Sequence, residues 1–282
     1  MSEIKMLSPE EKWEQATLAN NFIFYKVMYN NPDVCKELLE ILLQIKIDHI
    51  QMHSEETIEI DYGKKGVRLD VYAVGSRKAF NLEMQASDSG ELAERSRYYQ
   101  GILDVQELKS GEDYRELKDC YIIFICLKDI FRKGLAKYSF ENICLEDNSI
   151  KLNDRAHKLF FIAGNYDKIF DKRQKAFLKL VVSNKSTDIF GEKVSKLVED
   201  AKHNVQWRKQ YMEWERQMAY KYREGLAEGK KVGILEGSRQ KAIEDARSFF
   251  INGVSVELIA KSIGMTKEEV LEITKDLPTQ IK

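Results

Sequence analysis

Two runs of alternating apolar and polar residues predict a β-hairpin between residues 67 and 85. Apolar and polar side chains alternate along residues 67–74 and again along residues 79–85, which is the two-residue period of a strand with one buried face. Gly75 and Ser76 lie between the two runs and favour a turn. The pattern therefore predicts two antiparallel strands, each with an apolar face and a polar face.

Helices and further strands are predicted on both sides of the hairpin. The segment SPEE at residues 8–11 has the form of a capping box, so a helix is expected to begin there. Periodic apolar residues predict helices at residues 32–45 and 90–109. Short apolar runs predict strands near residues 57–61, 121–127, 143–145 and 158–164. Strands interleaved with covering helices indicate an α/β domain with a mixed sheet over residues 1–185.

The rest of the chain is predicted to be helical, with a charged extension at residues 186–245 and a small tail at residues 246–282. Glycine recurs every fourth residue from Gly225 to Gly237, which fits either a weak, solvated helix or linker, or a seam where two helices approach closely. An aromatic stripe in the extension is a candidate surface for a homo-oligomer: Trp207, Tyr211, Trp214, Met218 and Tyr222. The tail resembles a helix-turn-helix, for which either DNA contact or a packing or protein-contact role fits.

Composition and charge narrow the class of protein. The 282 residues carry a formal net charge of −1 and are 43% apolar. This apolar content allows a sizeable core. The charge balance argues against a protein coated in positive charge, although a local basic patch can still steer a polyanion. The four cysteines have no CxxC spacing and are expected to be free thiols of a reducing compartment. No apolar run approaches the length of a membrane-spanning helix, so we expect a cytoplasmic protein that does not contact membranes.

The polar face of the predicted hairpin carries two carboxylates and an amide. A turn between the two runs places Asp70 opposite residues 81–83, with facing side chains about 5 Å apart, so Asp70, Glu83 and Gln85 are expected to converge. Two close carboxylates repel each other unless a cation is present, and Mg²⁺ prefers oxygen ligands of this kind. The donor set favours metal-assisted phosphodiester hydrolysis, with Gln85 orienting a water or contacting a phosphate oxygen. The alternative is a solvent-facing polar side of a hairpin, with both acids in a surface ion-pair cluster beside Arg68.

Five segments carry a more specific signal. They are RLDVYA at 68–73, NLEMQ at 81–85, RSRYYQGIL at 95–103, SGEDYREL at 110–117 and YIIFICL at 121–127. In order and spacing they resemble a branch of the PD-(D/E)XK nucleases, the recombination-promoting nuclease and putative transposase family. The resemblance covers residues 10–170. It implies a restriction-endonuclease-like α/β core whose mixed sheet is flanked by helices, followed by a helical C-terminal extension.

The resemblance also implies roles for particular residues. Asp70 and Glu83 correspond to metal ligands, with Mg²⁺ or Mn²⁺ as the cofactor and DNA as the substrate. Gln85 stands where most nucleases of the superfamily have the lysine that positions the attacking water. A neutral amide lacks the charge with which lysine stabilises a developing anion. A second departure is Asn21, at a position where the family often has an acid.

Four further residues are candidates for the surroundings of the site: Arg68, Arg95, Tyr99 and Glu40. Arg95 and Tyr99 are four residues apart and share one face of the predicted helix. Arg95 is suited either to hold a phosphate bidentately or to pack against Tyr99. Arg68 is suited to phosphate contact or to a solvated turn. Glu40 borders the apolar stripe of the helix predicted at residues 32–45, where it either reaches the edge of the sheet or stays solvated.

Two functions from different classes follow from these observations. The first is a Mg²⁺-dependent DNA endonuclease linked to recombination or to a mobile element, with Asp70, Glu83 and Gln85 in the catalytic site. The second is a binding or assembly module that keeps the nuclease fold, has little or no activity and acts through its helical tail. The intact pair of acids favours the enzyme, whereas Gln85 and Asn21 favour the module.

Overall fold

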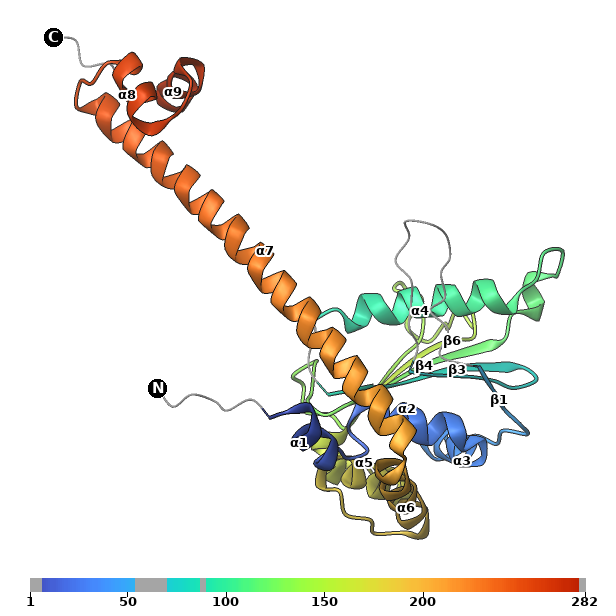
Figure 1. Ribbon diagram of the computed structural model, residues 1–282. Coiled ribbons are helices and arrows are strands. Elements are labelled where there is room, and N and C mark those ends of the chain that lie inside the picture. The colour runs from blue at the N-terminus through green and yellow to red at the C-terminus, as the bar shows by residue number, and fades with distance from the viewer. Residues whose placement is uncertain (1–6, 54–69, 87–89, 279–282) are drawn as a thin grey trace. The chain divides into compact units, whose positions relative to one another are not determined.

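The computed structural model describes residues 7–53, 70–86 and 90–278 of the chain. Within these ranges the centre of the fold is a six-stranded sheet in the order β1-β2-β3-β4-β6-β5 (Figure 1). The strands are β1 (Gln51–His53), β2 (Val71–Val74), β3 (Lys78–Gln85), β4 (Asp119–Cys126), β5 (Lys137–Phe140) and β6 (Ala156–Ile162). Strands β3, β4 and β6 run parallel and the other neighbours antiparallel, so the sheet is mixed, as predicted. The strand predicted at residues 57–61 lies outside the described residues, as does Arg68.

Helices cover both faces of the sheet (Figure 1). One face lies under α4 (Leu92–Glu107). On the other side of the sheet are α2 (Asn21–Asn30), α3 (Pro32–Leu43), α5 (Lys172–Ser183) and α6 (Ile189–His203). Most residues of β3, β4 and β6 are buried, as parallel strands require, because both of their faces are covered. The prediction of an α/β core with a mixed sheet flanked by helices is therefore confirmed.

The layer between α4 and the sheet is an apolar cluster that includes aromatic rings. From α4 it takes Leu92, Tyr99, Ile102 and Leu103, and from the strands residues such as Ile122, Phe124 and Phe160. The rings of Phe124 and Phe160 stack with their centroids 5.2 Å apart. Alternate residues of β3 face this layer, so the polar side chains of the hairpin project into it beside the apolar cluster.

The N-terminal helix α1 (Pro9–Glu14) begins at the predicted capping box. The hydroxyl of Ser8 accepts the N–H of Glu11, and the carboxylate of Glu11 accepts the N–H of Ser8. Trp13 in this helix is fully buried, and its ring centroid lies 5.1 Å from that of Tyr211. Tyr211 is itself only 1% exposed, so this member of the predicted aromatic stripe packs within the chain.

The prediction of a strand at residues 143–145 is wrong. Only Ile143 takes part in a bridge, and Leu145 is 86% exposed. The chain turns back at once, and the N–H of Cys144 donates to the carbonyl of Ile150. A run of three apolar residues is too short to form a regular ladder when the chain reverses beside it, so it remains a loop. The short edge strands β1 and β5 are not among the predicted strands.

The chain divides into two compact units, Met1–Met212 and Glu213–Lys282. Helix α7 (Val205–Ile251) is continuous through the glycine-spaced segment. It is followed by α8 (Val256–Ile263) and α9 (Lys267–Thr274). Helix α7 therefore runs on into the predicted tail at residues 246–282, which also contains α8 and α9.

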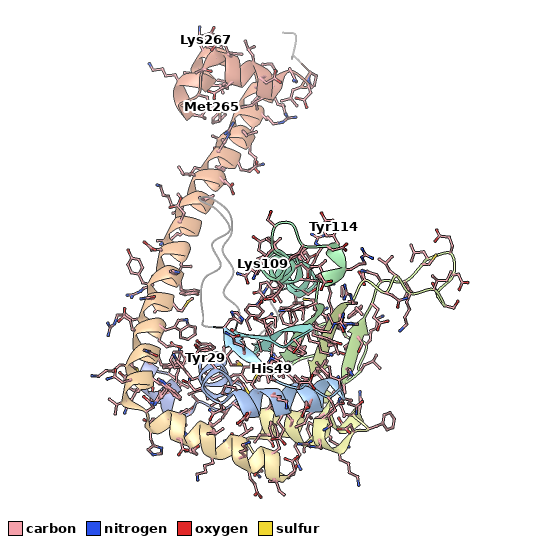
Figure 2. All side chains as sticks on the ribbon, turned by 90° about the vertical axis from the view of Figure 1, so that its right-hand side faces the viewer. Tyr29, His49, Lys109, Tyr114, Met265 and Lys267 are labelled. Atoms are coloured by element: carbon pink, nitrogen blue, oxygen red, sulfur yellow. The ribbon has the colours of Figure 1, made fainter. Side chains whose placement is uncertain are left out.

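The tail forms a small core of its own. Ala246, Ile259 and Val270 are buried against one another. Figure 2 shows Met265 and Lys267 at the turn between α8 and α9. None of the helices that the structure describes is both long and apolar enough to cross a membrane.

Candidate functional site

Two carboxylates meet where the ladder between β2 and β3 ends. Val71 pairs with Leu82 in the antiparallel register, which places Asp70 opposite Glu83. The N–H of Asp70 donates to Oε1 of Glu83 at 3.0 Å, and the N–H of Met84 donates to Oδ2 of Asp70 at 3.2 Å. Each side chain thus accepts a backbone N–H of the facing strand, so the two carboxylates are held close together, as the alternation predicts.

Helix α4 adds a positive charge to this pair. One guanidinium nitrogen of Arg95, Nη2, lies 3.3 Å from Oε2 of Glu83, and the other, Nη1, donates to Oε1 of Gln85 at 3.1 Å. Nε and Nη2 of Arg95 also donate to the hydroxyl of Tyr99, at 3.2 and 2.9 Å. The guanidinium carbon lies 5.7 Å from the ring centroid of Phe124. Arg95 therefore joins Glu83, Gln85 and Tyr99 through one planar group.

Burial controls the ionisation of the cluster. Glu83 is only 3% exposed, and this burial raises the pKa of its carboxyl, although the N–H of Asp70, the charge of Arg95 and the amide of Asn81 each act to lower it. Burial also raises the pKa of the Tyr99 hydroxyl, as does the nearby charge of Glu83. Burial alone would lower the pKa of Arg95, but its contacts with Tyr99 and Glu83 raise it overall. The site therefore holds a fixed cation against a buried acid.

The donor atoms of this cluster fit a hard divalent cation. Asp70, Glu83 and Gln85 all present oxygen atoms, the ligand type that Mg²⁺ prefers, usually with one or two carboxylates and several waters. The position already accommodates a positive group, the guanidinium of Arg95. The amide of Asn81, on the same face of β3, is buried with both of its polar atoms unpaired among the described residues. No cluster of three His, Cys, Asp or Glu side chains with metal-binding geometry occurs in the described ranges.

The structure does not bring every predicted residue to this cluster. Glu40 lies on α3, on the opposite side of the sheet from α4, and its carboxylate accepts the N–H of Ile47. This bond fastens the chain where it leaves α3 through Gln44, whose φ is +56°. Asn21 is exposed at the start of α2. Periodicity shows which side of a helix is apolar, but it does not show which face of the sheet that helix covers.

Two residues near the site are not among the predicted candidates. Phe124 lies beneath the guanidinium of Arg95 and pairs with Glu83 in the parallel register of β3 and β4. Asn81 precedes Glu83 by two residues on the same face of β3. The alternation of the hairpin already places Asn81 on the polar face, so that pattern was the available signal. Nothing in the sequence alone indicates that Phe124 lies near the site.

Comparison with known protein families finds a match over much of the chain. Residues 19–182, more than half of the chain, match the family described as PD-(D/E)XK nuclease family transposase. No curated protein and no solved structure shows significant similarity to the chain. The matched range includes all six strands and the helix that carries Arg95.

Proposed function

The chain belongs to the PD-(D/E)XK nuclease family transposases, and from this membership we propose that it is a divalent-cation-dependent endonuclease that hydrolyses phosphodiester bonds in DNA. Its biological setting would be recombination or a mobile element. The observation that carries the proposal is the pairing of Asp70 with Glu83 at the end of the β2–β3 ladder. A hairpin that served only as scaffold would have no need of two carboxylates at this point, one of them buried.

Asp70 and Glu83 are the residues that would hold the cation, Mg²⁺ or Mn²⁺, with the side-chain oxygen of Gln85 beside them. When bound, a divalent cation supplies activation of water and neutralises charge on the phosphate. Both carboxylates must be ionised to serve as ligands, and the N–H groups of Asp70 and Met84 hold them in place for this.

Arg95 supplies a positive charge beside Gln85, where most nucleases of the superfamily have a lysine. Gln85 is neutral, but its side-chain oxygen accepts a hydrogen bond from the Arg95 guanidinium. A guanidinium has five N–H donors and pairs well with phosphate oxygens, and Tyr99 fixes the plane of this one from the side. We propose that Arg95 holds the scissile phosphate and that Gln85 orients the attacking water.

A second candidate function is a binding or assembly module with the same fold. The observation in its favour is the ion pair between Arg95 and Glu83, which already satisfies the buried acid without any metal. Under this alternative the pair is purely structural and the helical tail, residues 213–282, carries the function.

Conversion of supercoiled plasmid to nicked or linear DNA distinguishes the two. The nuclease is expected to cut in Mg²⁺ or Mn²⁺ and to stop when EDTA removes the cation, and Asp70→Ala and Glu83→Ala are each expected to abolish cutting. Cutting that survives in both variants would place the activity elsewhere. Folded wild-type protein that binds DNA or protein but does not cut in any divalent cation would support the module.

A further inference from the structure

Asn81 carries a buried side-chain amide that has no hydrogen-bond partner among the described residues. Its side chain is 0% exposed, and neither Nδ2 nor Oδ1 has a hydrogen-bond partner within the part of the chain that the structure describes. Buried polar groups in folded proteins are almost always paired with protein or with ordered water, because an unpaired one keeps the full penalty of leaving solvent. An amide with both ends unpaired therefore indicates a missing polar neighbour.

The surroundings of Asn81 do not otherwise call for a polar side chain. It pairs with Tyr72 on β2 and with Ile122 on β4, and Ile122 belongs to the apolar cluster beneath α4. A leucine of similar size would pack in this layer without an unpaired group. The amide at this position is explained if it contacts something that the described part of the chain does not provide.

Glu83 shows where that contact lies. It lies two residues from Asn81 on the same face of β3, and the polar influence of the amide acts to lower the pKa of the Glu83 carboxyl. Neither amide atom has a direct hydrogen-bond partner among the described residues. Two polar groups that face each other beyond bonding distance are commonly joined by a water molecule. A buried water needs two to four polar partners, and the amide oxygen, the amide nitrogen and the carboxylate supply them.

We propose that Asn81 is a positioning residue of the cation site, whose amide holds a water molecule that hydrates the divalent cation bound by Asp70 and Glu83. This inference rests on the proposed function, because it requires the cation. Mg²⁺ gives up its hydration water reluctantly and usually keeps several waters in proteins. Groups that hold such outer ligands typically change metal affinity by about 10- to 100-fold when they are removed.

The test measures Mn²⁺ affinity by isothermal titration with the full-length protein, without DNA. Asn81→Leu keeps the volume of the side chain and removes both polar atoms, and it is expected to bind Mn²⁺ about 10- to 100-fold more weakly than wild type. Asn81→Ser, which keeps a hydrogen-bonding group and leaves room for water, is expected to recover most of the loss. Ser195→Ala is the matched control, because the Ser195 hydroxyl is also unpaired and buried but lies on α6. It is expected to bind as wild type does.

Weaker Mn²⁺ binding by Asn81→Leu that Asn81→Ser largely recovers supports the proposal. Wild-type affinity in Asn81→Leu overturns it, and shows that the amide has no part in the site. Should Asn81→Leu fail to fold, Asn81→Ala takes its place. Asn81→Ser is then expected to bind Mn²⁺ more tightly than Asn81→Ala, because serine keeps a group that can hold the water, and equal affinities would overturn the proposal.

The outcome is distinguishable from a failure of the proposed function. Glu83→Gln is expected to lose Mn²⁺ binding because it removes a ligand. If wild type itself binds no Mn²⁺, the cation site and the role of Asn81 are both wrong. If wild type binds, Glu83→Gln does not and Asn81→Leu binds normally, only the role of Asn81 is wrong.

Discussion

Glu83 is the most constrained ionisable group of the proposed site. It is almost fully buried, and its two oxygens face the N–H of Asp70 and the guanidinium of Arg95. A buried carboxylate is tolerated as an anion only when it is paired and hydrogen-bonded in this way. The pairing makes Glu83 a good ligand for a cation, and it also makes the protein sensitive to the ionisation of this one group.

Glu83→Gln is expected to change how stability depends on pH when EDTA is present. Burial raises the pKa of Glu83 above its ordinary value of 4.5, so the folded protein binds this proton more tightly than the unfolded chain does. Wild type therefore loses stability as pH rises from 4.5 through the raised pKa, whereas the glutamine variant has no such proton to lose. The free energy of unfolding of the variant minus that of wild type, from urea denaturation, should increase with pH. A difference that stays constant with pH contradicts a raised pKa.

Arg95→Ala is expected to reduce DNA cleavage by about 10²-fold, because it removes a preorganised charge from the site. Arg97→Ala is the matched control: Arg97 lies two residues along α4, is exposed, and should be dispensable for cutting. Arg95→Lys keeps the charge but loses the planar fork, so intermediate activity is expected. Single-turnover rates on a defined DNA measure all three. Equal rates for Arg95→Ala and Arg97→Ala would show that Arg95 only packs against Tyr99.

Part of this site could be predicted from sequence because its geometry is local. Strand alternation is enough to place Asp70, Glu83 and Gln85 on one face, and a spacing of four residues is enough to bring Arg95 to Tyr99. The contact between Arg95 and Glu83 could not be predicted, because it depends on how α4 lies across β3. Such placement is set by the packing of the helix on the sheet, which neither strand alternation nor helix periodicity specifies.

At the scale of elements, the start of α7 is part of the first unit's core. The ring of Tyr211 packs against Trp13 and Phe22, with centroids 5.1 and 5.5 Å away. The indole N–H of Trp13 donates to the carbonyl of Lys202, at the end of α6, at 3.1 Å. The aromatic cluster therefore joins α1 and α2, near the N-terminus, to the start of α7.

Tyr211→Ala is expected to lower the free energy of unfolding of the first unit by about 3–5 kcal/mol, the usual result of truncating a buried aromatic side chain. Tyr222→Ala on the same helix is the control: Tyr222 is 70% exposed, so its loss should change stability by less than about 0.5 kcal/mol. Thermal and chemical denaturation measure both. Similar effects of the two substitutions would mean that the stripe acts as one surface, as a homo-oligomer interface would.

The strength of the local sequence signal explains which elements could be predicted. The hairpin strands, the helix that carries Arg95 and the capped α1 have strong local signals, and each is found close to its predicted position. The sequence leaves open whether Glu40 reaches the site or stays solvated, and the structure places α3, which carries Glu40, on the face of the sheet opposite α4 (Figure 1). Local periodicity contains no information about that choice.

At the scale of the whole molecule, the chain combines a compact nuclease fold with a second, helical unit. Inside α7, the glycines at positions 225, 229, 233 and 237 have open space where a Cβ would be added. The homo-oligomer predicted for the aromatic stripe remains a proposal, and of the stripe Met218 and Tyr222 are 42% and 70% exposed.

Replacing these four glycines by alanine is expected to stabilise α7, because each glycine inside a helix costs about 1 kcal/mol relative to alanine. Helical content and the melting temperature of the second unit, followed by circular dichroism, should both rise, and DNA cleavage should be unchanged. Light scattering on the same variant tests the alternative of a close helix–helix seam. A wild-type oligomer that dissociates in the alanine variant would contradict a solvated helix.

The central claim is that the end of the β2–β3 ladder is the catalytic site, and one comparison tests it most directly. Asp70→Asn keeps an oxygen that can accept the N–H of Met84, so the hairpin should hold, but it removes the charge that a cation needs. Glu40→Gln makes the same chemical change on α3, where the side chain accepts the N–H of Ile47. Mg²⁺-dependent cleavage of DNA is expected to fall to background in Asp70→Asn and to remain at the wild-type rate in Glu40→Gln. Wild-type cleavage by folded Asp70→Asn would contradict the assignment.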